Sequence, residues 1–126
     1  IPKKYFDKGD PYHCYCHKTS RLIKETFNKD IPILTTFQSR FGPQEWLQPY
    51  TDKTLEKLPK EGKKNVLVIS PGFSSDCVET LEEISIQGKE SFLEAGGEKF
   101  DTIPCLNDNE DHIKLLLHLI NKSIRK

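Results

Sequence analysis

The sequence contains no methionine, a single tryptophan and only four cysteines among its 126 residues. It also lacks an excess of either charge, because 19 basic residues balance 19 acidic ones. A chain without net positive charge has no overall electrostatic attraction for nucleic acid, so we expect no nucleic-acid partner. Apolar runs stay below the roughly 18 residues that a membrane span needs. The chain is nevertheless long enough to bury one hydrophobic core.

The small number of cysteines argues against a disulfide scaffold, since a core of this size is stable without one. Cys14 and Cys16 share one predicted element, whereas Cys77 and Cys105 lie in others. We therefore expect four free thiols in a reducing cytoplasm. Peripheral contact with a membrane surface stays open.

Two histidines flank the first two cysteines in the run His13-Cys14-Tyr15-Cys16-His17. His13 and His17 would share a face of a helix, but Cys14 and Cys16 would point to nearly opposite sides of it. The run is not Cys-x-x-Cys-His, so covalent haem attachment is not indicated. We predict no native metal at this cluster. We place His112 and His118, on the last predicted helix, at the surface or its boundary.

Helical and strand-like segments alternate along the chain. Helices are predicted at 10–28, 51–61, 77–95 and 110–124, and short apolar strands near 33–37, 65–69 and 101–104. This alternation predicts an α/β domain with three layers, in which helices cover both faces of a parallel sheet, as in half of a Rossmann- or flavodoxin-like fold. Ligands of such sheets bind beyond the carboxyl ends of the strands.

Three carboxylates follow the second of these strands. Asp76, Glu79 and Glu83 are spaced by three and four residues, which brings them onto one face of a helix. Stacked like charges destabilise a surface helix slightly, whereas a site that holds a cation or transfers protons requires them. Capping of the helix start is the preferred interpretation for Asp76 and also accounts for Glu79, but it leaves Glu83 unexplained.

The segment around these acids has the sequence Phe73-Ser74-Ser75-Asp76-Cys77-Val78-Glu79-Thr80-Leu81-Glu82-Glu83. It resembles the active-site signature of ferrochelatase, which inserts ferrous iron into protoporphyrin IX. Other blocks agree with that family in the expected order, namely 9–12, 37–43, 46–52 and 103–107. The resemblance extends from Ile1 to about Arg125.

The resemblance implies that residues 1–126 are the C-terminal domain of a bacterial-type ferrochelatase, a lyase of haem biosynthesis. The absence of methionine and the start at Ile1 agree with this view. In the family, a catalytic histidine lies just before the segment that matches Ile1 and Pro2. The partners implied are protoporphyrin IX, ferrous iron and the missing N-terminal half. We expect little activity from this chain alone.

The same resemblance assigns roles to individual residues. Glu79 matches the catalytic glutamate, and Glu79 with Glu83 would bind the metal. Gln87 stands where the family often carries a third acid, which implies a shorter acidic path. The residues implied to bind or support substrate are Ser39, Trp46 and Phe73, with Asp76 in a supporting role.

Two alternatives stay open. The first is a chelatase for cobalt or nickel, although such enzymes usually carry histidines on this helix. The second is a non-catalytic module that binds tetrapyrrole or metal. We expect iron as the substrate metal and no organic cofactor, and we expect no iron–sulfur cluster because four cysteine ligands cannot be assigned. An apolar seam around Trp46 and Phe73, left by a missing half, would favour self-association.

Overall fold

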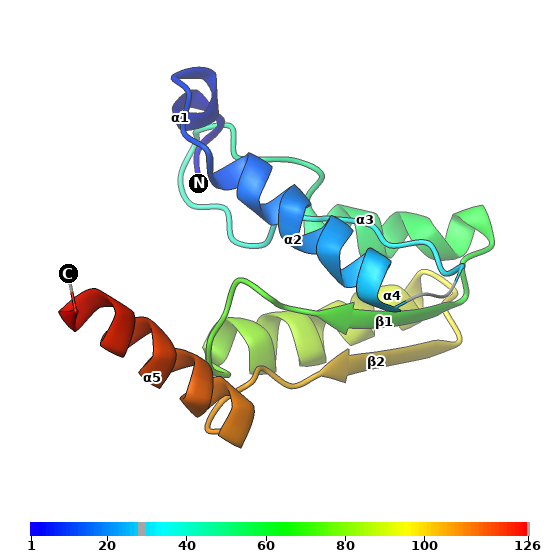
Figure 1. Cartoon of the computed structure of the whole chain (residues 1–126). Coiled ribbons are helices and arrows are strands. Elements are labelled where there is room, and N and C mark those ends of the chain that lie inside the picture. The colour runs from blue at the N-terminus through cyan, green and yellow to red at the C-terminus, as the bar shows by residue number, and fades with distance from the viewer. Residues whose placement is uncertain (28–29, 126) are drawn as a thin grey trace.

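The computed structural model describes residues 1–27 and 30–125 (Figure 1). The elements in chain order are α1 (Lys3–Asp7), α2 (Tyr12–Phe27), α3 (Thr51–Lys57), the 3₁₀ helix η1 (Leu58–Glu61), β1 (Asn65–Ile69), the π-helix η2 (Glu79–Gly88), α4 (Lys89–Glu94), β2 (Lys99–Ile103) and α5 (Glu110–Ile124). Within these ranges, no helix is both long and apolar enough to cross a bilayer. The alternation of helices with parallel strands confirms the predicted α/β class.

The sheet consists of β1 and β2, which pair in parallel from Asn65 with Lys99 to Ile69 with Ile103. The expected third strand at 33–37 is wrong. Within the described part of the chain, the strand-type pairing of this segment is confined to a bridge between Phe37 and Tyr50. Thr35 and Thr36 instead make side-chain hydrogen bonds, to Ser20 at 2.7 Å and to Thr51 at 2.9 Å. Hydroxyl contacts with α2 and α3 therefore hold the segment where a sheet ladder was expected.

The core lies against one face of the sheet. Phe92 of α4 is fully buried and packs against Phe100 of β2 and Leu55 of α3. Val66 and Val68, the alternate residues of β1, face the same cluster. Burying a large aromatic ring contributes about 1.5–3 kcal/mol relative to exposing it. This packing fixes β1 and β2, and with them the loops that follow the two strands.

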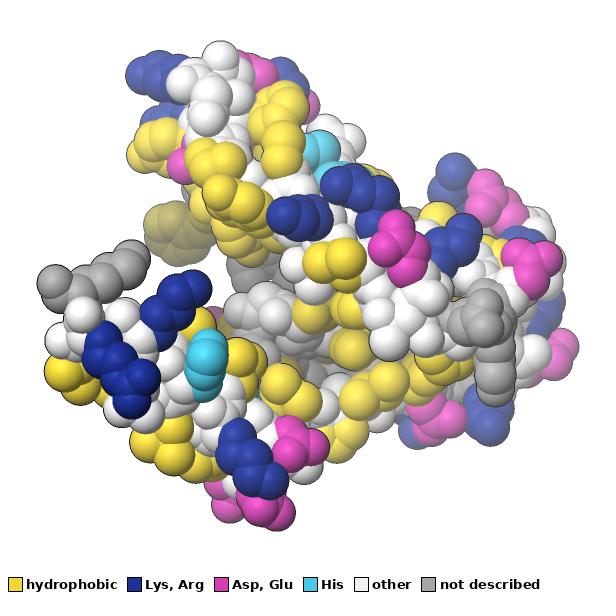
Figure 2. Space-filling view, in the orientation of Figure 1, with side chains coloured by type: hydrophobic (Ala, Val, Ile, Leu, Met, Phe, Trp, Pro, Cys, Tyr) yellow, Lys and Arg dark blue, Asp and Glu magenta, His cyan; other side chains and the backbone are white. Residues whose placement is uncertain are grey.

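The other face of the sheet is open. Leu67, Ile69 and Ile103, which we call the open face, are 62%, 47% and 43% exposed. Figure 2 shows hydrophobic side chains gathered on the side of the molecule between α2 and α5. The expected helix layer on both faces is thus present on one face only in the part of the chain that is described. The apolar stripe of α5 is also exposed, from Ile113 at 43% to Ile120 at 53%.

The predicted helix at 77–95 is present but is not uniformly α-helical. Its first part, η2, has π geometry, in which backbone bonds join residues five apart, and α4 completes it. Gly96, with φ of 96°, ends the helix as expected. The helix predicted at 10–28 corresponds to α2, and its expected last residue, Asn28, lies outside the described ranges. The helix predicted at 110–124 matches α5.

Candidate functional site

The loops after β1 and β2 meet at one edge of the sheet, as parallel strands require. The backbone amide of Asn107, after β2, donates to the carbonyl of Ser74, after β1, at 3.0 Å. Asn107 adopts a positive φ of 48°, a conformation that asparagine tolerates better than most residues. The predicted rim therefore exists, and backbone bonds between the two loops define it.

Asp76 joins the two loops of this rim and accepts three hydrogen bonds. Its carboxylate accepts from the Asn107 amide at 2.8 Å, from the Thr80 hydroxyl at 2.9 Å and from the Cys105 backbone at 3.3 Å. We call these four residues the Asp76 cluster. The bonds from Asn107 and then from Thr80 lower the pKa of Asp76. Burial is the main cause that raises the pKa of the Cys105 thiol, followed by its contact with Asp76.

The capping interpretation of Asp76 is wrong. No side chain caps the start of η2, where Val78 occupies the capping position. The hydroxyl of buried Thr80 instead accepts from the backbone of Cys77 at 3.0 Å and donates to Asp76. Asp76 therefore ties the loop after β1 to the loop after β2, and Thr80 organises the helix start.

Glu79 and Glu83, which we call the carboxylate row, lie four residues apart on η2 and are both half-buried. In a π-helix, as in an α-helix, residues four apart lie close to one line along the helix. Thr80, Ile84 and Gly88, the adjacent line, are buried against the domain. The row therefore borders the buried side of η2, and Gln87 continues it as the sequence indicates.

The environment of Glu79 favours its ionised form. A hydrogen bond with the Cys77 side chain, and then one with its own backbone, lower the pKa of the Glu79 carboxyl. A carboxylate that stays ionised at neutral pH is a ready ligand for a cation. A general base works best with a pKa near the working pH, so a lowered pKa makes Glu79 a weaker base in the state described.

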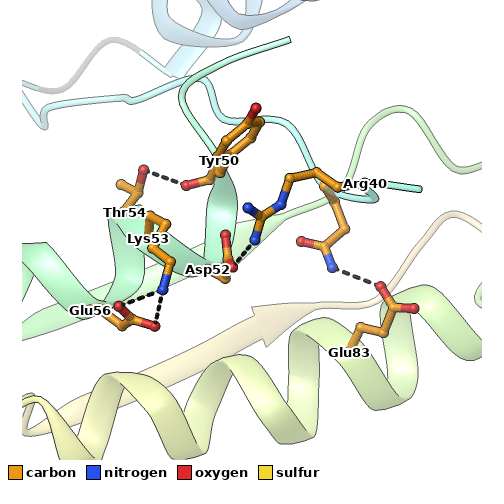
Figure 3. Close-up of polar contacts among 8 residues, drawn as sticks. Arg40, Tyr50, Asp52, Lys53, Thr54, Glu56 and Glu83 are labelled. Carbon is orange, nitrogen blue, oxygen red and sulfur yellow. Dashed lines mark hydrogen bonds and ion pairs between the residues drawn. The ribbon is translucent and has the colours of Figure 1, made fainter. Parts of the chain in front are cut away.

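Glu83 is held from a different part of the chain. Gln38 donates from its side-chain amide to Glu83 Oε2 at 2.7 Å, a bond drawn as a dashed line in Figure 3. Gln38 begins the long loop that ends at α3. This bond brings the loop against η2 and involves only one of the two carboxylate oxygens of Glu83.

The loop at 38–50 is fastened at several points. Arg40 forms an ion pair with Asp52 at the start of α3 and stacks over the ring of Tyr50 at 4.3 Å (Figure 3). Trp46 donates from Nε1 to the carbonyl of Phe41 at 2.9 Å, and its backbone pairs with Pro2. Such anchoring fits a loop that carries binding residues on a fixed scaffold.

The three predicted substrate residues lie on two loops, Ser39 and Trp46 on the loop at 38–50 and Phe73 on the loop after β1. Ser39 is exposed and has a positive φ of 67°, next to Gln38. Trp46 and Phe73 are half-buried. Among the described hydrogen bonds, the link from the long loop to the carboxylate row comes from Gln38, whereas Trp46 bonds within its own loop. The seam expected around Trp46 and Phe73 stays a prediction. Phe41, in the same loop as Trp46, is 85% exposed, and further apolar side chains are exposed on the open face and on α5.

Sequence reasoning missed three residues of the rim. Gln38 and Asn107 belong to the quoted motifs, and their amides could have been considered as partners of the acids that follow β1. The expectation for His112 is wrong, because its side chain is only 8% exposed. Its Nδ1 lies 2.7 Å from the Asn107 carbonyl and its Nε2 lies 3.0 Å from the Ser74 hydroxyl. His112 thus joins both loops to the start of α5, which no pattern in the sequence indicated.

The histidine–cysteine run lies on α2. His13 and His17 approach each other with 3.2 Å between their Nε2 atoms. Burial, and then repulsion by His13 and Arg21, lower the pKa of His17. All four cysteines are free, as predicted. Among residues 1–27 and 30–125, no group of three or more histidine, cysteine or acidic side chains is arranged to hold a metal ion.

Comparisons with known proteins agree on one family. The protein-family model described as Ferrochelatase matches residues 1–124. Proteins named ferrochelatase are 57% identical to this chain in Allorhizobium ampelinum, 58% in Rhizobium johnstonii and 54% in Francisella tularensis subsp. novicida. These alignments cover 98–99% of this chain but only 37–38% of each relative. The chain therefore spans less than two fifths of the length of these relatives.

Proposed function

Because the chain belongs to the ferrochelatase family, we propose that it serves as part of an enzyme that inserts ferrous iron into protoporphyrin IX to form protohaem. The observation that carries this proposal is the carboxylate row, which lies at the carboxyl edge of a parallel sheet on a π-helix. π-Helical turns occur frequently at functional sites. Ligands of open α/β sheets bind at this edge.

In the proposed reaction, ferrous iron enters the macrocycle and two pyrrole protons leave. Glu79 presents iron or accepts a proton, and its lowered pKa favours the first of these roles until porphyrin binds. Glu83 extends the path by one helical turn, with Gln38 fixing one of its oxygens. Trp46, Phe73 and Ser39 contact the macrocycle from the two loops, since flat apolar ligands are held by aromatic walls.

We further propose that residues 1–126 form the C-terminal domain of that enzyme, with a histidine from the preceding segment facing Glu79 across the porphyrin. The open face and the stripe of α5 support this arrangement, because isolated domains rarely expose large apolar patches without a partner. The remaining part of the enzyme, or a second copy of the chain, would cover them. Light scattering should then show association of the 126-residue chain, and a strict monomer at high concentration would count against the proposal.

Iron acts as substrate in this proposal, without an organic cofactor or an iron–sulfur cluster. The free state of all four cysteines is compatible with a reducing compartment, and we propose the cytoplasm.

Anaerobic titration of the intact enzyme with ferrous iron and protoporphyrin IX tests the function. Loss of porphyrin fluorescence with the appearance of a haem spectrum, at catalytic turnover, is the expected result. Turnover with cobalt or nickel but not with iron would favour a different chelatase. Porphyrin binding without metallation would mean that the protein is a binding module.

A further inference from the structure

The histidines of α2 form a pair that the carboxylate row does not use. The Nε2 atoms of His13 and His17 are 3.2 Å apart, whereas their ring centroids are 4.4 Å apart. The rings therefore converge at their Nε2 edges. Spacing by four residues on a helix accounts for this approach, because it places the two side chains one turn apart on the same face.

The separation of the two nitrogens matches the bite of a chelated metal ion. With metal–nitrogen bonds of about 2.0–2.1 Å, a tetrahedral ion holds two ligand nitrogens about 3.4 Å apart, and an octahedral ion holds cis ligands about 2.9 Å apart. The observed 3.2 Å lies between these two values. Contrary to the expectation from sequence, we propose that His13 and His17 form a chelating site for a borderline divalent metal ion such as Zn²⁺, with water completing its coordination.

A hydrogen bond between the two Nε2 atoms, together with ring packing, holds the pair in this geometry without an ion. The ring of His13 stacks on Phe37 at 5.5 Å and 20°, and contacts Phe6 at 4.8 Å. The ring of His17 is tilted against the same Phe37 ring, with 6.1 Å between their centroids. Ring contacts restrict rotation of both imidazoles, so an ion that binds them loses less free energy in ordering its ligands. Both side chains are half-buried, which leaves room for water on the ion.

The neighbouring thiols do not complete a larger site. Cys16 interacts with the Tyr12 hydroxyl, and Cys14 is exposed two residues away, on a different side of the helix. Within the described ranges, no cluster supplies a third protein ligand. Neutral imidazole suits Zn²⁺ and Ni²⁺, whereas carboxylates suit harder cations. The pair therefore differs in ligand chemistry from the carboxylate row, and its metal binding does not depend on the proposed function.

The site can be tested on the intact protein with Zn²⁺ alone and no porphyrin. Nitrogen NMR of labelled histidine rings should show that Zn²⁺ shifts the Nε2 signals of His13 and His17 and leaves that of His118 unchanged. His118 is the matched control, because it is an exposed histidine on α5. Zinc that shifts neither signal of the pair would overturn the proposal, and this measurement needs no variant.

Calorimetric titration of variants adds a second readout. His13→Gln and His17→Gln should each weaken zinc binding more than about tenfold, since even partners outside the ligand shell cost that much. His118→Gln and Cys14→Ser should bind zinc like the unmodified protein. Equal loss in Cys14→Ser, or full affinity in both glutamine variants of the pair, would contradict the assignment. If either variant fails to fold, the ring-nitrogen shifts decide the question.

Discussion

Asp76 and Glu79 are carboxylates only three residues apart, and their surroundings differ in kind. Asp76 accepts hydrogen bonds from Thr80, Cys105 and Asn107, which come from a helix and from the loop after the neighbouring strand. The pKa of Glu79 is lowered by contacts within its own turn. A lowered pKa therefore does not by itself separate a structural acid from a functional one. We propose that the origin of the donors makes this distinction, because donors from segments distant in sequence tie Asp76 into the fold, whereas Glu79 has no such donor among the described contacts.

The largest expected difference concerns turnover. Glu79→Gln in the intact enzyme keeps shape and hydrogen bonding but removes the charge. If Glu79 presents iron or takes pyrrole protons, the rate of porphyrin metallation should fall by roughly 10²–10⁴-fold, the contribution of a positioned acid or base. Stopped-flow fluorescence of protoporphyrin measures this rate. Porphyrin affinity is the control and should barely change, because apolar walls dominate binding.

A smaller effect is expected one turn further along the row. Glu83→Gln should slow metallation by less than the ~10²-fold lower limit for a positioned general base. The change leaves an amide opposite the Gln38 amide, so Gln38 can rotate and keep a bond of the same length. The same rate measurement applies. A loss as large as that in Glu79→Gln would show that the two acids act as one unit.

A substitution at Thr80 should change the free energy of unfolding rather than the rate of metallation. Thr80→Val preserves volume but removes the buried hydroxyl that joins Cys77 to Asp76. Leaving these groups without their partner should cost about 1–3 kcal/mol of unfolding free energy. Urea denaturation followed by circular dichroism measures this loss. An unchanged midpoint would mean that water replaces the hydroxyl at no cost.

The smallest expected effect is the loss of folding stability in acid that follows from protonation of Asp76. Bonds from Asn107 and then Thr80 hold the folded pKa of Asp76 below its unfolded value of about 3.9. The unfolded chain therefore binds a proton more readily, so the stabilisation is complete above that value and is lost as the pH falls through the folded pKa. Asp76→Asn should remove this pH-dependent contribution to the free energy of unfolding. The difference between the thermal unfolding curves of the two proteins should be largest near pH 6 and should shrink as the pH falls through the folded pKa of Asp76.

Local patterns predicted the elements of the chain well where the contacts are local. The parallel pair of β1 and β2, the long α5 and the break near Pro59 all follow from period, capping and proline chemistry. The segment at 33–37 shows the limit. Its apolar, β-branched composition fits a strand, but pairing depends on which backbone lies beside it, and that is a tertiary property.

In the candidate site, too, features set by local spacing could be predicted, whereas contacts between distant residues could not. The sequence indicates that Glu79 and Glu83 share a line, because the spacing of four sets it. It does not show that Gln38, which is 45 positions away, bonds Glu83, or that His112 is buried between two loops. It also suggested a cap at Asp76, since a short acid before a helix usually caps it. The competing donor at Asn107 lies 31 positions away and is not visible in any local window.

The most direct test compares Asp76→Asn with Glu79→Gln in the intact enzyme, at a temperature where both are fully folded. Asp76→Asn turns an amide toward the Asn107 amide and should lower the melting temperature, since two donors then face each other. Its metallation rate per folded molecule should stay within about tenfold of the unmodified enzyme, whereas Glu79→Gln should lose at least about a hundredfold. Equal rates in the two variants would contradict the distinction between a structural Asp76 and a functional Glu79.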